Sequence, residues 1–352
     1  MGMETLSVRL ARTSLSIGTA TKGIVVMQMR KQAIPRFSRL LAVFGCVLTL
    51  SVGVLAEEAD SLLLPSESQG WTPSSELHVA RTPTARGAVE IRGTGTLEFD
   101  PSQIQLLRSD VFQTEHFSVF DVLVHLADQG AIELGYQFDE SADTYVIKTL
   151  NGLEGWWYDA HYAGGSFNRT VVRMDHYPVK DGMDILFYLE DPERLTAIHE
   201  NFRQEVDRRQ ENGDQVIIPI VTIRSPQASL TFDEVVVKAH NVRADLFQPG
   251  VTTVLDVLLS LGEQEKLTSL TLTWRDRAED ADPIDNYFVN LITGDAFSPE
   301  ATGSCIFTHQ IGSETLKDYL APNACEGSHI HLTADLEIIV SPEYVEWLWV
   351  CL

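Results

Sequence analysis

The chain has 352 residues, of which 44% are hydrophobic, and its 26 Lys and Arg face 50 Asp and Glu, for a net charge of −24. This hydrophobic fraction supports a real core and excludes a disordered acidic tail. The acidity argues against nucleic acid and against an anionic membrane surface as partners, because both attract clustered Lys and Arg. The length suggests two domains.

Residues 1–56 have the features of an export leader. Basic residues between positions 30 and 39 precede the apolar stretch Leu40–Leu55, and small residues end at Ala56. This order is typical of a secretory signal peptide, and we expect no membrane span once it is cleaved. Translation is expected to start at Met27 or Met29. A lipoprotein site at a cysteine in the apolar stretch, or a mitochondrial leader, are the alternatives.

Removal of that segment takes away seven basic residues and one acidic residue, which leaves a net charge of −30. Such a charge keeps an exported protein soluble through self-repulsion, or attracts a cationic partner. From the leader we expect a periplasmic, cell-surface or extracellular protein.

Residues 57–87 are rich in Ser, Pro and Thr and predict a flexible linker. The remaining chain repeats itself. Residues 110–126 and 245–261 are identical at eight of 17 positions. Towards the ends of the copies, the alignment pairs 179–189 with 340–350.

In chain order, each copy begins with a predicted hairpin, at 88–107 and at 216–239. A helix follows, with its N-cap at Ser118 in the first copy and at Thr252 or Thr253 in the second. A strand ending at Asn151-Gly152, an aromatic strand and a final hairpin closed at residues 180–182 complete the first copy. One helix on a mixed sheet predicts an α+β fold of two tandem β-grasp-like domains, 88–191 and 214–352.

A connecting helix is predicted over residues 192–213. Asp191 is placed to cap it, Pro192 takes the first helical position, and Gly213 stops it. Apolar residues recur at near-helical spacing from Leu195 to Val206, so we expect an amphipathic helix that packs against one or both domains.

Several segments together resemble the transcobalamin-like C-terminal domain, a small module found in exported bacterial proteins. They are the helix start at 119–123, Asn151-Gly152 after Tyr145, the strand Gly155-Trp156-Trp157-Tyr158, and residues 179–184. The second copy departs from this pattern at most of these places. The resemblance implies the fold, and it implies binding of a small molecule or a polysaccharide. In cobalamin carriers the module acts beside a large helical domain that this chain lacks, so no cofactor is expected, with cobalamin or a divalent metal as the alternatives.

The aromatic strand is the predicted ligand contact. Trp156 and Tyr158 face one side of a strand and Trp157 faces the other, so at least one large ring is expected near the surface, where it could stack on a ring-shaped or sugar ligand. His161 extends the same strand. The alternative is that one ring fills the core and another packs under the connecting helix.

The second copy contains the candidate metal ligands and most cysteines. His329 and His331 share one face of a strand and form half of a metal site, or are two surface histidines. A disulfide between Cys305 and Cys325 is expected in an exported protein, with Cys351 as a competing partner. The acidic residues 276–285 predict a solvated loop rather than a calcium site.

The sequence contains no nucleophile elbow, phosphate loop, CxxC or HExxH motif. We therefore expect a non-enzymatic exported protein that binds a small molecule or glycan. The alternative is an envelope structural or protein-interaction module that uses exposed sheet edges.

Overall fold

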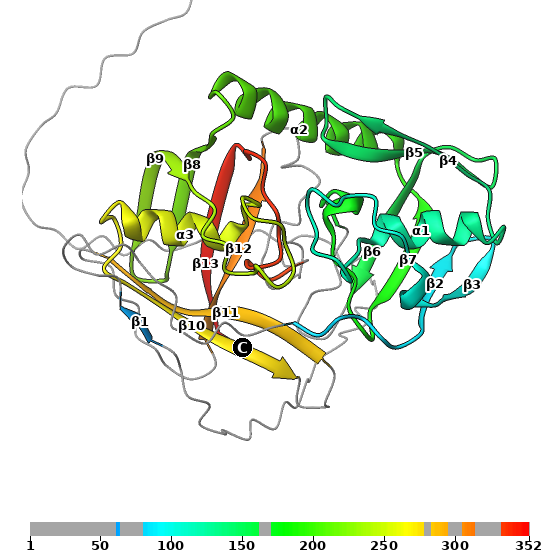
Figure 1. Cartoon of the computed structure of the whole chain (residues 1–352). Coiled ribbons are helices and arrows are strands. Elements are labelled where there is room, and N and C mark those ends of the chain that lie inside the picture. The colour runs from blue at the N-terminus through cyan, green and yellow to red at the C-terminus, as the bar shows by residue number, and fades with distance from the viewer. Residues whose placement is uncertain are drawn as a thin grey trace, which may run out of the picture. The chain divides into compact units, whose positions relative to one another are not determined.

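The computed structural model describes residues 61–63, 80–161, 170–277, 283–294, 305–313 and 332–351. The predicted leader lies outside these ranges. The described residues belong to one compact unit, which is α+β and contains both mixed and antiparallel sheets (Figure 1). The predicted fold class is therefore confirmed at this level.

The first copy pairs its opening hairpin with its last strand. Strand β2 is antiparallel to β3 and parallel to β7, and β6 is antiparallel to β7, which gives the order β3-β2-β7-β6. Strands β4 and β5 form a separate antiparallel pair. The elements are β2 Gly87–Ile91, β3 Gly95–Phe99, η1 Pro101–Gln103, α1 Val119–Asp128, β4 Leu134–Asp139, β5 Thr144–Leu150, β6 Trp156–His161, η2 Met174–His176 and β7 Asp184–Leu189.

The second copy follows the same plan in a larger sheet. Strand β8 is antiparallel to β9 and parallel to β13, and β12 is antiparallel to β13. The counterparts of β4 and β5 join this sheet, whose order is β1-β10-β11-β12-β13-β8-β9. The elements are β8 Val216–Arg224, β9 Ser229–Val237, α3 Val254–Glu263, β10 Ser269–Arg277, β11 Pro283–Thr293, β12 Cys305–Gly312 and β13 Tyr344–Cys351.

Both repeated helices begin with the same cap. The hydroxyl and the backbone N–H of Ser118 each donate to Asp121 at 2.7 Å. In α3, the hydroxyl and the N–H of Thr253 donate to Asp256 at 3.0 and 2.7 Å. Each capping box satisfies backbone groups that a helix start leaves without partners. The predicted helix starts are confirmed, with Thr253 rather than Thr252 as the cap of α3.

The connecting helix α2 spans Pro192–Glu211, with Asp191 as its N-cap. Its apolar residues Ile198 and Phe202 are buried in the core of the first copy. The guanidinium of Arg208, near its other end, donates to the carbonyl of Ser341 in the second copy. The predicted amphipathic helix is confirmed, and it contacts both copies (Figure 1).

The two copies also meet through equivalent residues of the repeat. The rings of Phe112 and Phe247 lie 5.6 Å apart between centroids. The backbone N–H groups of Gln113 and Gln248 each donate to a carbonyl of the other copy, at 2.9 and 2.8 Å. Their side-chain amides donate to Phe247 O and Phe112 O, at 3.0 and 2.9 Å. These bonds are reciprocal between equivalent residues of the two copies.

The hydrogen bonds correct one detail of the repeat alignment. Val179 N donates to Phe117 O at 2.9 Å, and Ile339 N donates to Thr252 O at 3.0 Å. Val179 therefore corresponds to Ile339, so the predicted alignment with Val340 is wrong by one residue. A run of consecutive apolar residues at 338–340 matches equally well after a slip of one position, so sequence similarity could not set this register.

Parts of the predicted linker 57–87 are bound to the folded unit. Strand β1, Ser61–Leu63, pairs with β10. The N–H of Ala80 donates to the carboxylate of Asp245 at 2.8 Å, and Asp181 accepts from the N–H groups of residues 84 and 85. These bonds satisfy backbone groups of a polar segment. The segment has no apolar periodicity, so its contacts could not be predicted from the sequence.

Candidate functional site

The predicted ligand contact on β6 is buried. Trp156, Trp157 and Tyr158 are 4%, 3% and 0% exposed. Trp157 Nε1 donates to Thr170 O at 2.8 Å, and the Tyr158 hydroxyl donates to Val172 O at 3.0 Å. The expectation of a surface ring on this strand is therefore wrong, because both faces of β6 are covered.

Helix α2 covers one of these faces. The Trp157 ring lies 6.4 Å from the ring of Phe202 between centroids. Tyr158 packs edge-on against Tyr177 at 5.8 Å. The alternative of a core ring and a ring under the connecting helix is the correct one. His161, at the end of β6, is half-buried, and burial lowers its pKa from the usual value.

The other predicted sites remain predictions. His329, His331 and Cys325 lie outside the described residues. Cys305, on β12, lies directly opposite Cys351 on β13. Both candidate disulfide partners of Cys305 therefore stay open.

Exposed aromatic residues instead occur on the β4–β5 hairpin. Tyr136 and Phe138 are 40% and 39% exposed. They are alternate residues of β4, so they share one side of the hairpin. Across the strand pair, Phe138 lies opposite Tyr145, with the ring centroids 5.1 Å apart. Tyr136 lies 5.8 Å from Tyr145. We call Tyr136, Phe138 and Tyr145 the aromatic face.

Helix α1 packs against the aromatic face through Phe120. Phe120, fully buried on α1, stacks on Tyr145 with centroids 5.2 Å apart and an angle of 8° between the rings. Tyr136 meets Phe120 edge-on at 5.4 Å. Edge-on and stacked contacts of this kind stabilise aromatic clusters beyond their buried area. Contacts with Phe120 therefore fix the positions of the Tyr136 and Tyr145 rings.

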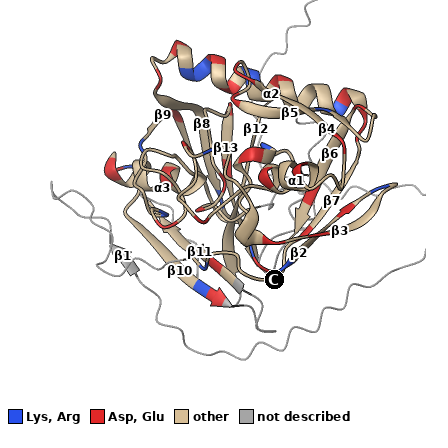
Figure 2. Ribbon diagram, turned by 45° about the vertical axis from the view of Figure 1, so that its right-hand side comes forward, with Lys and Arg blue, Asp and Glu red and all other residues tan. Residues whose placement is uncertain are grey.

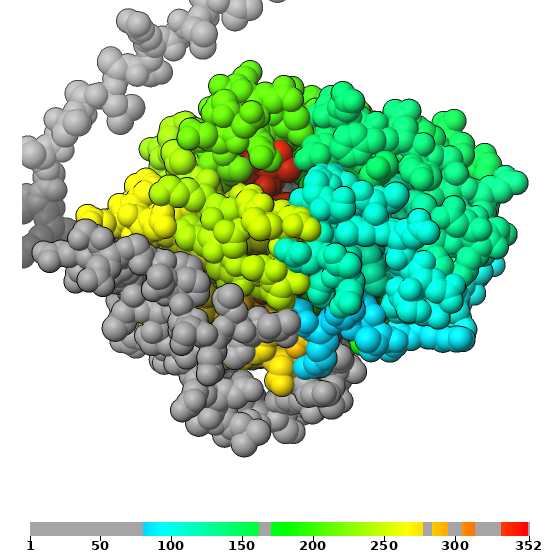
Figure 3. Space-filling model, in the orientation of Figure 1, coloured from blue at the N-terminus to red at the C-terminus, as the bar shows by residue number. Residues whose placement is uncertain are grey.

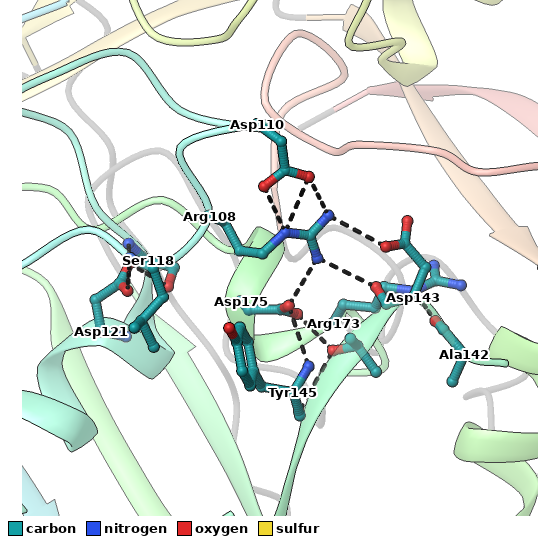
Figure 4. Close-up of polar contacts among 11 residues, drawn as sticks. Arg108, Asp110, Ser118, Asp121, Ala142, Asp143, Tyr145, Arg173 and Asp175 are labelled. Carbon is teal, nitrogen blue, oxygen red and sulfur yellow. Dashed lines mark hydrogen bonds and ion pairs between the residues drawn. The ribbon is translucent and has the colours of Figure 1, made fainter. Parts of the chain in front are cut away.

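A buried ion-pair network fixes the backbone beneath Tyr145 (Figure 4). Asp175 accepts from Arg108 Nη1 at 2.9 Å, from Tyr145 N at 3.1 Å, and from the hydroxyl of Thr144. The guanidinium carbon of Arg108 lies 5.5 Å from the ring centre of Phe138. One arginine thus links the base of β5 to a ring of the aromatic face.

The edge of this network is acidic. Arg108 Nη2 also contacts Asp110 at 2.8 Å and Asp143 at 3.2 Å, and the side chain of Asp110 is 65% exposed. The hydrogen bond from Arg108 lowers the pKa of Asp110. Burial raises the pKa of Asp175 and that of Tyr145 above their usual values. Two carboxylates thus contact the same guanidinium that lies near the ring of Phe138.

The second copy repeats the network. Arg243 Nη1 contacts Asp335 at 2.6 Å, and Asp335 accepts from Tyr287 N at 3.1 Å. Trp274 takes the position of Phe138 beneath the guanidinium of Arg243, at 5.3 Å. The arginine–aspartate pair is therefore a repeated structural element. Among the described residues, no large hydrophobic side chain on β10 or β11 is exposed. The pair of exposed rings is therefore a feature of the first hairpin.

Sequence reasoning missed both features. Arg108 and Arg243 stand two residues before Asp110 and Asp245, so extending the repeat by two positions towards the N-terminus reveals them. Tyr136 and Phe138 alternate in a short strand, which is a detectable signal for a shared face. Which face is exposed depends on packing against α1, which the sequence does not state.

Comparison with protein-family models, curated proteins and solved structures finds no match for the chain. Among the described residues, no group of three or more His, Cys, Asp and Glu is arranged to hold a metal ion. No helix in the described part of the chain is long and apolar enough to cross a membrane.

Proposed function

We propose that this chain is a non-enzymatic binding protein whose aromatic face takes a glycan. The observation that carries the proposal is the pair of exposed rings, Tyr136 and Phe138, held on one side of the β4–β5 hairpin. This proposal keeps the class of function expected from the sequence and places the ligand contact on β4 and β5 instead of β6.

The chemistry of the aromatic face suits a sugar. The apolar C–H face of a sugar ring can stack on an aromatic side chain, while its hydroxyls donate to neighbouring carboxylates. Asp110 and Asp143 supply an exposed and a half-buried carboxylate on Arg108, whose guanidinium lies near the ring of Phe138. The stacking contact between Phe120 and Tyr145 reduces the loss of side-chain freedom on binding.

Affinity electrophoresis through gels containing different soluble polysaccharides tests the proposal. The wild-type protein should be retarded by at least one polysaccharide, and the Tyr136→Ala and Phe138→Ala variants should migrate faster in that gel. Leu153→Ala is the control, because Leu153 is also exposed, at 53%, but lies outside the aromatic face. Equal retardation of all four proteins would reject the aromatic face as the contact.

We also propose that each copy is a β-grasp-like domain. The orders β3-β2-β7-β6 and β9-β8-β13-β12 support this, since in each copy the first strand runs parallel to the last and one helix follows the hairpin. The proposed boundaries remain 88–191 and 214–352. This arrangement agrees with the resemblance to the transcobalamin-like domain, and export to the periplasm or cell surface remains part of the proposal.

One observation favours a second candidate, an envelope or protein-interaction module. Strand β9, Ser229–Val237, is an outer strand of the seven-stranded sheet, and its described partner is β8 alone. An outer strand of nine residues offers backbone groups for strand addition by a partner chain. A pull-down that recovers a stoichiometric protein partner, lost when Thr231 is replaced by Pro, would favour this candidate.

A further inference from the structure

One lysine of the first copy extends across the boundary into the second copy. Lys180, just before β7, donates from its amine to the backbone carbonyl of Ile284 and to the side-chain oxygen Oδ1 of Asn286, both on β11. Ile284 and Asn286 are 5% and 0% exposed. The amine of a half-buried residue thus lies against buried groups of the other copy.

Residues 80–85 cover this contact. Arg81 pairs with Asp285 of β11 at 3.1 Å, and the N–H groups of residues 84 and 85 donate to Asp181. Figure 3 shows this segment in blue against the yellow strands of the second copy. Residues 80 and 81 line a small pocket together with Lys180, and this pocket has room for about one water molecule. The segment therefore keeps most of the solvent away from the lysine.

The surroundings favour the neutral form of the amine. Burial, together with the positive charge of Arg243, lowers the pKa of Lys180 from 10.5 to about 7. Acidic residues occur throughout the described ribbon (Figure 2), and three of them, Asp335, Asp285 and Asp245, oppose this shift in part. About half of the Lys180 amines are therefore neutral at pH 7, and a neutral amine is a nucleophile.

The side-chain amide of Asn286 presents a carbonyl carbon to this nucleophile. Lys180 Nζ contacts Oδ1 of Asn286, and the carbon Cγ is one C=O bond of about 1.23 Å further on. The contact therefore brings Nζ to about 3.5 Å from Cγ, which is the separation of a near-attack geometry.

A buried carboxylate is next to this amide. Asp335 is 0% exposed and accepts from the N–H of Tyr287, the residue after Asn286, at 3.1 Å. In the first copy the counterpart of Asn286 is Thr144, whose hydroxyl donates to the equivalent carboxylate, Asp175. The second copy therefore has an amide where the first copy has a hydroxyl, and Asp335 is placed to accept and return a proton.

We propose that Lys180 and Asn286 form an isopeptide bond, a covalent amide that joins the two copies. Lys180 Nζ attacks Cγ of Asn286, and the bond between Cγ and Nδ2 breaks. The proton that Nζ loses passes through the carboxylate of Asp335 to Nδ2, which leaves as ammonia. One amide replaces another, so the step needs no oxidant or reductant. The bond involves no residue of the aromatic face and stands whether or not that face binds a glycan.

Mass spectrometry of the full, denatured wild-type protein tests the proposal. Its mass should be about 17 Da below that of the unmodified chain with the same N-terminus and disulfide content, because one ammonia is lost. Proteolysis should release one branched peptide that joins residue 180 to residue 286. The Lys180→Arg and Asn286→Leu variants should have the unmodified mass. Lys148→Arg is the matched control, because Lys148 is exposed on β5, and it should keep the loss of 17 Da.

Denaturing gel electrophoresis gives a second readout. The two residues are 106 positions apart, so a bond between them closes a long loop and keeps the denatured chain more compact. The wild type and Lys148→Arg should therefore migrate faster than Lys180→Arg and Asn286→Leu. An unmodified wild-type mass, or a loss of ammonia that maps to other residues, would overturn the proposal. The wild-type measurement decides this even if a variant fails to fold.

Discussion

Replacing Asp175 by Ala should destabilise the protein far more than replacing Asp110, although both carboxylates contact Arg108. Asp175 is fully buried and accepts from Arg108 Nη1 at 2.9 Å and from Tyr145 N at 3.1 Å. Its removal leaves a buried guanidinium without its most buried partner, which costs about 3–5 kcal/mol. The side chain of Asp110 is 65% exposed, and solvent screening limits its contribution to about 1 kcal/mol or less.

Urea unfolding measures the difference. With a slope of about 2 kcal/mol per molar, the midpoint should fall by roughly 2 M for Asp175→Ala and by less than about 0.5 M for Asp110→Ala. Asp335→Ala provides the counterpart in the second copy, because Asp335 contacts Arg243 Nη1 at 2.6 Å, and it should behave like Asp175→Ala. Equal small shifts for all three variants would refute a role for the buried pairs in holding each copy together.

Three further predictions concern the contact between the copies, His199 and the leader. Phe112→Ala and Phe247→Ala should each lower the free energy of unfolding in urea by about 3–5 kcal/mol. The double variant should show a coupling energy of about 0.5–1.5 kcal/mol, because the two rings are in contact. Strictly additive effects would contradict this ring contact between the copies. Burial lowers the pKa of His199 from 6.5 to about 4, so at pH values between these the unfolded chain binds more protons than the folded protein. The free energy of unfolding should therefore fall as the pH drops from 6.5 to 4, by at most about 3 kcal/mol relative to the His199→Asn variant. Parallel pH profiles of the two proteins would contradict this. N-terminal sequencing of the exported protein should begin at Glu57, and an uncleaved chain in the envelope would contradict the predicted leader.

Local signals in the sequence predicted the three helices and the opening hairpin of each copy. They missed strand β4, and the predicted hairpin closed at residues 180–182 is wrong, because no strand precedes this turn and β7 pairs with β6 and β2. Ser118 and Thr253 cap their helices through side-chain contacts three residues away, and Asp191 with Pro192 marks the start of α2. These contacts involve neighbours in the chain, so spacing alone reveals them.

The site could not be predicted in the same way, because it depends on distant contacts. Arg108 and Asp175 are 67 positions apart, and nothing in either segment indicates that they pair. The aromatic composition of β6 fits both a surface binding strand and a core strand. The position of α2 over Trp157 decides that it is a core strand, and the sequence does not reveal that position. The exposure of Tyr136 and Phe138 likewise follows from how the hairpin packs on Phe120.

The most direct test of the account is isothermal titration calorimetry of the Phe138→Ala variant with the polysaccharide that retards the wild-type protein. Loss of one stacking ring should weaken binding roughly tenfold, or by about 1.4 kcal/mol, while Leu153→Ala keeps the wild-type Kd. The midpoint of urea unfolding should stay within about 0.5 M of the wild type, because the ring is 39% exposed. An unchanged Kd for Phe138→Ala would contradict the claim that the aromatic face binds the glycan.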